Sequence, residues 1–70
     1  MAAIAEVHPR IIKRREVEVR TGLPRSTMYD RIKRGDFPAP IPLGARSVGW
    51  LEHEIDAWLA DRVAQARNRA

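Results

Sequence analysis

The sequence contains no cysteine, which excludes disulfide bonds and thiolate metal sites. It also contains no apolar run of about 18 residues, the length that a membrane-spanning helix requires. The first ten residues, "MAAIAEVHPR", lack the apolar stretch of a signal peptide. We therefore expect a cytoplasmic protein that makes no contact with a membrane.

Aromatic residues are few: two tryptophans, one tyrosine and one phenylalanine in 70 residues. A chain of this length buries only about 60% of the surface that it exposes when unfolded, so its core must be thin. Aromatic side chains are the largest apolar groups available to such a core. We therefore predict that Phe37, Trp50 and Trp58 are core residues. Stacking of Trp50 on a nucleobase is the alternative.

Groupings that carry out catalysis or bind metals are also missing. The two histidines, His8 and His53, lie far apart and have no cysteine partner, so a zinc site is not expected. Glu52 and Asp56 share one face of a predicted helix, but acids at a helix start have a structural role through the helix dipole. The sequence shows no nucleophile with a base, no phosphate loop and no cofactor motif. We predict no enzyme activity, no cofactor, no metal and no small-molecule substrate.

Positive charge, in contrast, is abundant and uneven. The net charge is +4 and the sequence pI is about 10.7. The segment 10–46 holds ten basic and four acidic residues, a net charge of +6, whereas 51–61 holds four acids and no base. Clustered bases in a protein of high pI are typical of nucleic-acid binding. A solvated charged face is the alternative.

Two short helices are predicted in the basic segment. The first spans about Arg15 to Arg20 and ends at Gly22, where glycine takes a positive φ without steric cost. The alternation of Val17 and Val19 leaves a strand as the alternative here. The second begins near Pro24, which suits the first turn of a helix because it lacks an N–H.

The second helix buries one side and ends at a glycine. Met28 and Ile32 lie four residues apart on one face, Leu23 packs at its start, and Gly35 closes it. Two short helices joined by "TGLP" form a helix-turn-helix pattern.

The next segment, "DFPAPIPLGARSVGW", is rich in proline and glycine and predicts a two-stranded hairpin. Its tip lies at Gly44 to Arg46, and it must pack on the helices to be stable. The apolar pair Ile11-Ile12 either forms a further strand or docks on the core.

From about Glu52 to Arg67 the pattern becomes helical, with acids in the first turns and arginines at the end. The apolar stripe of this helix consists of Ile55, Trp58, Leu59 and Val63.

The order helix, turn, helix, hairpin, helix is that of a winged helix-turn-helix, and the run "TGLPRSTMYDRIKRGDFPAPIPLGARSVGWLEHEIDAWL" resembles the AlpA family of small phage and prophage regulators. That family is related to excisionases and to the DNA-binding head of MerR-type regulators. The resemblance covers roughly 11–62. It rests on Thr21-Gly22-Leu23, Arg25-Ser26-Thr27, Tyr29, Gly35, Phe37-Pro38, Leu43-Gly44, Arg46, Val48-Gly49-Trp50 and Ile55-Asp56-Ala57-Trp58.

The resemblance implies a mainly α fold with a small β-hairpin, a winged helix-turn-helix of the MerR and excisionase type. We assign this domain to 11–67 and a flexible arm to 1–10. Three residues depart from the family pattern: Pro24 replaces a serine N-cap, Arg14 an apolar residue, and Asp30 a base. The effect of Asp30, weaker phosphate binding or altered base preference, stays open.

The predicted DNA contacts lie on the second helix and the hairpin. On a helical wheel, Ser26, Asp30 and Lys33 point away from the face of Met28 and Ile32. A recognition helix reads bases with its N-terminal residues.

We assign Arg25 and Ser26 to base edges or phosphates, Tyr29 to a phosphate or sugar, and Lys33 to a phosphate. Thr27 either contacts DNA or bonds the local backbone, and Tyr29 is half core in the alternative interpretation. Arg31 and Arg34 are predicted to be a solvated fringe.

Arg46 at the hairpin tip is predicted to enter a minor groove, with Ser47 beside it in the DNA-binding set. A solvated arginine is the alternative.

The leading hypothesis is a sequence-specific double-stranded DNA-binding protein, either a prophage-type transcriptional regulator or an excisionase. Expected partners are DNA, further copies of the chain on repeated half-sites and an integrase. The competing hypothesis is a protein-interaction module that uses the acidic and apolar last helix.

Overall fold

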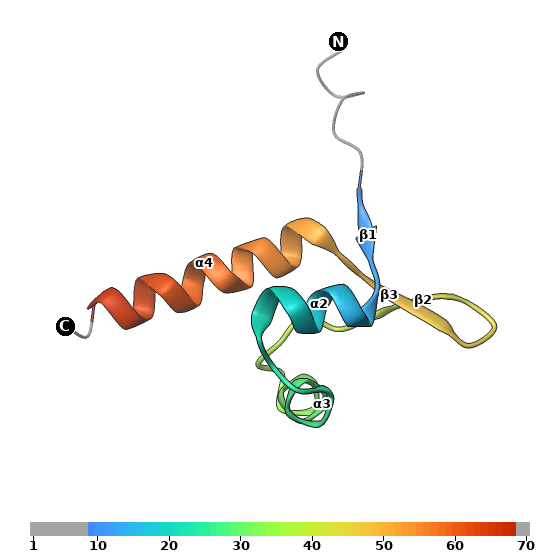
Figure 1. Cartoon of the computed structure of the whole chain (residues 1–70), viewed down its shortest axis with the longest axis horizontal. Helices are drawn as coiled ribbons and strands as arrows, with labels where there is room; N and C mark the ends of the chain where they lie inside the picture. Colours follow the sequence, from blue (N-terminus) through green and yellow to red (C-terminus); the bar gives the residue numbers. More distant parts are fainter. Residues whose placement is uncertain (1–8, 69–70) are drawn as a thin grey trace, which may run out of the picture.

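The computed structural model describes residues 9–68, which form three helices and a small antiparallel sheet (Figure 1). The elements in chain order are β1 (Ile11–Ile12), α2 (Arg14–Thr21), α3 (Arg25–Lys33), β2 (Ile41–Gly44), β3 (Ser47–Leu51) and α4 (Glu52–Asn68). The predicted order of helix, turn, helix, hairpin and helix is confirmed. The predicted arm at 1–10 lies almost entirely outside the described residues.

The helix α2 is confirmed over the alternative of a strand. Val17 is fully buried, while Val19 is 78% exposed on the opposite side of the helix. Gly22 adopts a φ of 74° and its N–H donates to the Glu18 carbonyl at 2.8 Å. Thr21 adds a second link, because its hydroxyl donates to the Val17 carbonyl and accepts from the Leu23 N–H. These bonds fix the turn between α2 and α3.

The helix α3 begins without a side-chain cap, as the proline at position 24 predicts. Its end is closed by a complete Schellman motif at Gly35, whose φ is 75°. The Gly35 N–H donates to the Ile32 carbonyl at 3.0 Å, and the Asp36 N–H donates to the Arg31 carbonyl at 2.8 Å. The chain therefore leaves α3 in a fixed direction.

The sheet has three strands in the order β1-β3-β2, so the predicted hairpin is confirmed and Ile11-Ile12 adds the further strand that was one of its two alternatives. The pair Ile11-Ile12 forms a strand because β3 offers it a free edge: Ile11 pairs with Leu51 and Ile12 with Trp50. Gly49 in the middle of β3 makes room for this crowding. A Cβ at Gly49 would collide with Ile11 Cγ2 and lie 3.1 Å from a Leu43 methyl.

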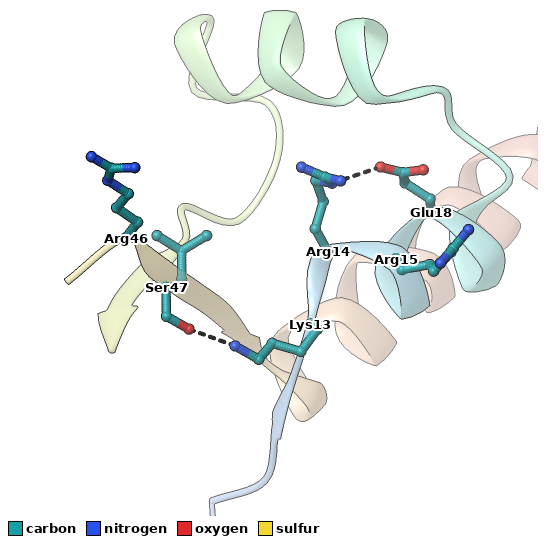
Figure 2. A pocket seen from close by; sticks show the side chains of 7 residues that line it. Lys13, Arg14, Arg15, Glu18, Arg46 and Ser47 are labelled. Atoms are coloured by element: carbon teal, nitrogen blue, oxygen red, sulfur yellow. Dashed lines mark hydrogen bonds and ion pairs between the residues drawn. The ribbon is translucent and has the colours of Figure 1, made fainter. Parts of the chain in front are cut away.

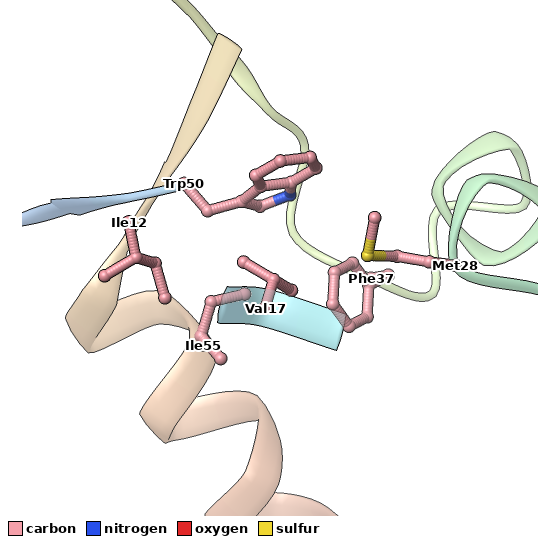
Figure 3. Close-up of a cluster of buried hydrophobic side chains, with 6 residues drawn as sticks. All are labelled: Ile12, Val17, Met28, Phe37, Trp50 and Ile55. Atoms are coloured by element: carbon pink, nitrogen blue, oxygen red, sulfur yellow. The ribbon is translucent and has the colours of Figure 1, made fainter. Parts of the chain in front are cut away.

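The core draws one buried side chain from each helix, from β1 and β3, and from the proline-rich loop (Figure 3). These residues are Ile12, Val17, Met28, Phe37, Trp50 and Ile55. The strand β2 contributes none, so the β2–β3 turn, here called the wing, projects from the body (Figure 1).

Of the predicted core aromatics, Phe37 and Trp50 are buried as expected. Trp58 packs at the edge of the core and is only half-buried. Val63, the last residue of the predicted stripe, is 47% exposed because α4 runs on beyond the body of the protein (Figure 1).

Two indole groups hold the proline-rich loop that leads from α3 to the wing. Trp50 Nε1 donates to the Pro38 carbonyl and Trp58 Nε1 to the Asp36 carbonyl, each at 2.9 Å. The Phe37 and Trp58 rings also meet edge to face, with centroids 4.8 Å apart. This anchoring sets the position of the wing relative to α3.

Within residues 9–68, no helix is long and apolar enough to cross a membrane. In the same part of the chain, no three histidine or acidic residues gather closely enough to hold a metal ion.

Candidate nucleic-acid interface

The first turn of α3 presents a polar, hydrogen-bond-donating surface. Arg25, Ser26 and Thr27 are all exposed, and the helical hydrogen bonds begin only with the Met28 N–H, which donates to the Pro24 carbonyl at 2.9 Å. The preceding N–H groups of the turn have no partner inside the helix. Within 9–68, Thr27 makes no side-chain bond to the local backbone, so the alternative role of its hydroxyl has no support.

Tyr29 connects this surface to the core. Its half-buried ring meets Trp50 edge-on at 6.4 Å, which agrees with the interpretation that it is half core. On its outer side, the Arg25 guanidinium lies 5.8 Å from the Tyr29 ring centroid. The ring therefore supports Arg25 at the start of α3. Lys33 is exposed at the other end of the helix.

The wing carries the other two predicted contacts. Arg46 is exposed in the turn between β2 and β3, beside Ala45, whose φ of 41° places it in the left-handed region. Ser47 is half-buried, and its hydroxyl accepts a hydrogen bond from Lys13 Nζ at 2.5 Å. The wing is thus tied to the residue that precedes α2.

An open hollow of about 600 Å³ lies between the start of α2 and the wing (Figure 2). Its lining, which we call the basic hollow, consists of Lys13, Arg14, Arg15, Glu18, Arg46, Ser47 and Val48. From the sequence, the basic triplet at 13–15 added to the charge of the segment, and Arg14 departed from the family pattern, but no binding site was predicted there. The signal that could have indicated this site is the run of three bases at the start of a predicted helix. Only the fold, however, brings these residues to the wing.

Between α2 and α4, basic side chains are bound to acids of the same chain. Arg20 donates to Glu16 and Glu52, each at 2.7 Å, and lies 3.4 Å from Asp56. The hydrogen bond to Glu52, then that to Glu16, raises the pKa of Arg20 above its ordinary value. These contacts join α2 to α4.

Arg31 corrects a prediction, because it is not part of a solvated fringe. It is half-buried, donates to the Asp36 carboxylate at 2.6 Å and lies 5.9 Å from the Trp58 ring centroid. Arg62 from α4 donates to the same carboxylate at 2.7 Å. The end of α3 is thereby clamped to α4. Arg34 is 71% exposed as predicted, although it pairs with Asp30 at 2.9 Å.

The cations therefore divide into two sets by whether a carboxylate lies at ion-pairing distance. Within 9–68, the lysines and arginines with no carboxylate at ion-pairing distance are Lys13, Arg15, Arg25, Lys33, Arg46 and Arg67. All but Arg67 belong to α3 or to the basic hollow. We call these five the unpaired cations. They mark a candidate surface on α3, the wing and the start of α2, which also carries the paired Arg14 and Arg34.

Comparison with known proteins identifies the group to which this chain belongs. The family described as "Prophage CP4-57 regulatory protein (AlpA)" matches residues 10–63. The chain is 44% identical over 59 residues to the DNA-binding transcriptional activator AlpA of Escherichia coli (strain K12), across 76% of this chain and 84% of that protein.

A second relative is the "Uncharacterized protein ORF88" of Enterobacteria phage P4, which is 44% identical over 55 residues. That alignment covers 79% of this chain and 62% of the phage protein, so the chain spans less than two thirds of this relative. Because the family match extends over most of the chain, from β1 to α4, the chain belongs to the AlpA family of prophage regulatory proteins.

Proposed function

We propose that this protein binds double-stranded DNA and acts in the cytoplasm as a prophage-type transcriptional regulator. The observation that carries the proposal is the gathering of the unpaired cations on α3 and around the basic hollow, while the cations facing α4 are neutralised. DNA affinity comes largely from cations that meet phosphates. Cations already bound to carboxylates contribute little to it.

In this proposal α3 enters the major groove with its first turn against the base edges. Arg25 is the residue for direct readout, because a guanidinium bonds guanine O6 and N7 together. Ser26 and Thr27 supply hydroxyls that bond either bases or phosphates, and the free N–H groups of the turn suit a phosphate. Tyr29 and Lys33 contact the backbone.

Arg46 on the wing is placed in the adjacent minor groove, where the potential is most negative. Ser47 already accepts a bond from Lys13, so its contribution to DNA binding runs through that lysine.

The relative from Escherichia coli is named a transcriptional activator, which supports regulation as the role. Excision of a prophage would use the same surface, with an integrase as partner. The location of the bound site separates the two roles. A site beside a promoter supports regulation, whereas a site within an attachment region, with recruitment of integrase, supports excision.

The proposal is tested by selecting bound sequences from random duplex DNA and measuring affinity against salt concentration. We expect a defined preferred site and a steep loss of affinity as salt rises, because bound phosphates release counterions. Recovery of no preferred sequence, together with loss of all binding by about 100 mM salt, would argue against the proposal.

We further propose that copies of the chain bind side by side on repeated half-sites. A nine-residue α3 reads few bases, and each base pair contributes only about 1–3 kcal/mol of discrimination. The acids Glu52 and Asp56 are already bound to Arg20, which weakens the case for the whole acidic start of α4 as a protein-binding surface.

Glu54 and Asp61 are the acids left for a neighbour. They line a groove of about 560 Å³ with Pro38, Ala57 and Trp58. A basic and apolar edge of a second copy fits this lining. Titration on DNA with one, two and three half-sites tests the arrangement: we expect affinity per site to rise with each added half-site, and tight binding to a lone half-site with no such gain would contradict it.

A further inference from the structure

We infer that the basic hollow is a second phosphate site, which holds one backbone phosphodiester of the duplex outside the contact made by α3. The inference rests on the proposed DNA binding and adds Lys13 and Arg14 to the residues that carry it. The contact involves no base edge, so it adds affinity and fixes the position of the protein without adding sequence preference.

Lys13 is the first ligand in this site. Its ammonium group bonds the neutral Ser47 hydroxyl, and within 9–68 no carboxylate lies within ion-pairing distance of it. An ammonium group has three donors, so this single bond leaves two for phosphate oxygens. Figure 2 shows the side chain reaching from the start of α2 to Ser47 at the start of β3.

Arg14 is the second ligand, and its internal partner holds it weakly. Its Nε lies 3.1 Å from a Glu18 carboxylate oxygen, yet this nitrogen makes no well-aligned hydrogen bond. The side chain is 42% exposed, and a pair of this kind contributes little in water. A phosphate therefore has only a weak contact to replace.

The backbone favours an anion at the same place. The helix α2 begins immediately after Lys13 and has no side-chain cap, so the positive end of its dipole adds to the positive charge at the hollow, with Glu16 as the one acid of its first turn. Arg15 and Arg46 complete the lining with two more unpaired cations. Val48 is the one apolar side chain of the lining, which leaves no enclosed wall for an apolar ligand.

The shape of the hollow indicates a polymer and not a free anion. It is open to solvent and lies between two elements, the wing and the start of α2, that a passing strand would touch in turn (Figure 2). A phosphate between Lys13 and Arg46 would also hold the wing against α2, beyond the single bond from Lys13 to Ser47.

The test compares Lys13→Ala and the double variant Lys13→Ala/Arg14→Ala with Arg67→Ala. Arg67 is the matched control for Lys13→Ala, because it lies near the end of α4, pairs with no carboxylate of 9–68, and its replacement also removes one positive charge. Affinity for the preferred duplex is measured from about 50 to 200 mM salt, the range over which phosphate contacts are most clearly resolved. Circular dichroism verifies that each variant folds.

We expect Lys13→Ala to lower the slope of log K against log salt by about 0.9, the value of one phosphate contact in B-DNA. The preferred sequence should be unchanged. Arg67→Ala should leave the slope unaltered. Equal slopes for Lys13→Ala and Arg67→Ala would overturn the site.

A separate melting experiment distinguishes binding of a DNA phosphate from binding of free inorganic phosphate. If inorganic phosphate raises the melting temperature of the parent more than chloride of equal ionic strength, and Lys13→Ala abolishes the difference, the hollow takes free phosphate and its assignment to DNA is overturned. An absence of duplex binding by the parent at about 50 mM salt would defeat the proposed function itself. A normal parent slope that no hollow variant alters would defeat only the inference about the hollow.

Discussion

Arg20 and Arg25 are five residues apart in the sequence and serve opposite sides of the protein. Arg20 contacts the carboxylates of Glu16, Glu52 and Asp56, which ties α2 to α4. Arg25 contacts only the face of the Tyr29 ring and within 9–68 meets no acid. A basic residue in this chain therefore either stabilises the fold or stays available to a ligand, depending on which side chains the tertiary structure places beside it.

The same division holds across the domain. The net charge of +6 over 10–46 overstates the charge offered to DNA, because Arg10 and Arg20 pair with Glu52 of α4, an acid outside that segment. Arg31 pairs with Asp36, an acid that the +6 already includes. What remains is concentrated on α3 and the basic hollow. We call Arg10, Arg20, Arg31 and Arg62 with their acid partners the paired side, and the five unpaired cations the unpaired side. The comparison predicts that variants on the paired side lose stability and variants on the unpaired side lose affinity.

The largest effect is expected in the core itself, at Trp50. Its side chain is fully buried, and its Nε1 satisfies the Pro38 carbonyl. Trp50→Ala should lower the free energy of unfolding by about 3–5 kcal/mol, which in so small a domain can abolish folding. Urea unfolding followed by circular dichroism measures the change.

Trp58→Ala is the matched comparison for Trp50→Ala, because Trp58 is only half-buried and its replacement should destabilise the fold less. A Trp50→Ala protein that melts within a few degrees of the parent would show that the core is organised differently.

The next effect is expected on the unpaired side, at Arg25. Arg25→Ala should weaken binding to the preferred duplex by about 1–3 kcal/mol and relax the preference at one base pair. Its melting temperature should stay close to that of the parent, because Arg25 is exposed and stacks only on the Tyr29 ring. Binding titrations combined with selection from random DNA measure both properties.

Arg25→Lys serves as the control, since lysine keeps the charge but lacks the two-pronged donor geometry. If lysine restores both affinity and base preference, Arg25 contacts a phosphate and not a base. Unchanged affinity in Arg25→Ala would remove Arg25 from the interface altogether.

Much of the fold was predictable because local rules agree with the final structure. Gly22 and Gly35 take the positive φ values that end α2 and α3, and Pro24 starts α3 without a cap. The hairpin and the start of α4 follow from alternation and from the acids of the first turn. These features depend on residues that are neighbours in the sequence, so the sequence pattern alone indicates them.

The parts that could not be predicted depend on contacts between distant residues. Arg31 was expected to be solvated, but its guanidinium pairs with the Asp36 carboxylate just after α3. Arg62 of α4 pairs with the same carboxylate. Lys13 reaches Ser47, 34 residues later, only because β1 and β3 are paired. Neither the charge count nor the helical wheel contains this information.

A variant of Asp36 tests whether an arginine is kept from DNA by its ion pair or by its location in the fold. Asp36→Asn removes the ion pairs to Arg31 and Arg62 but keeps the backbone carbonyl that accepts from Trp58 Nε1. We expect the free energy of unfolding to fall by about 1 kcal/mol, since both pairs are partly exposed. DNA affinity should change less than about twofold, because the freed arginines lie on the paired side and meet no phosphate.

Asp61→Asn is the matched control for this variant on DNA with a single half-site, where no neighbouring copy meets Asp61, because it removes the same charge from a residue whose side chain bonds only Gln65. An affinity gain in Asp36→Asn well above that of Asp61→Asn would mean that pairing alone, and not position, keeps these arginines from DNA.

The smallest effect is expected at Asp30, the acid on the exposed face of α3. It pairs with Arg34 at 2.9 Å, four residues along the helix, and both side chains are more than half exposed. Asp30→Asn should therefore lower stability by only about 0.3–0.5 kcal/mol. It should also raise DNA affinity at low salt, because it removes an anion beside Ser26 and Lys33 and releases Arg34 towards the duplex.

The salt dependence decides how Asp30 acts. If it restrains phosphate binding, Asp30→Asn should steepen the slope of log K against log salt by up to about 0.9, with the selected sequence unchanged. If Asp30 instead accepts a bond from a cytosine amino group, the variant should change the preferred base and leave the slope as it was. We expect the first outcome, because Asp30 lies on the exposed face of α3 beside Lys33, which is assigned to a phosphate. A changed base preference would show instead that Asp30 contacts a base directly.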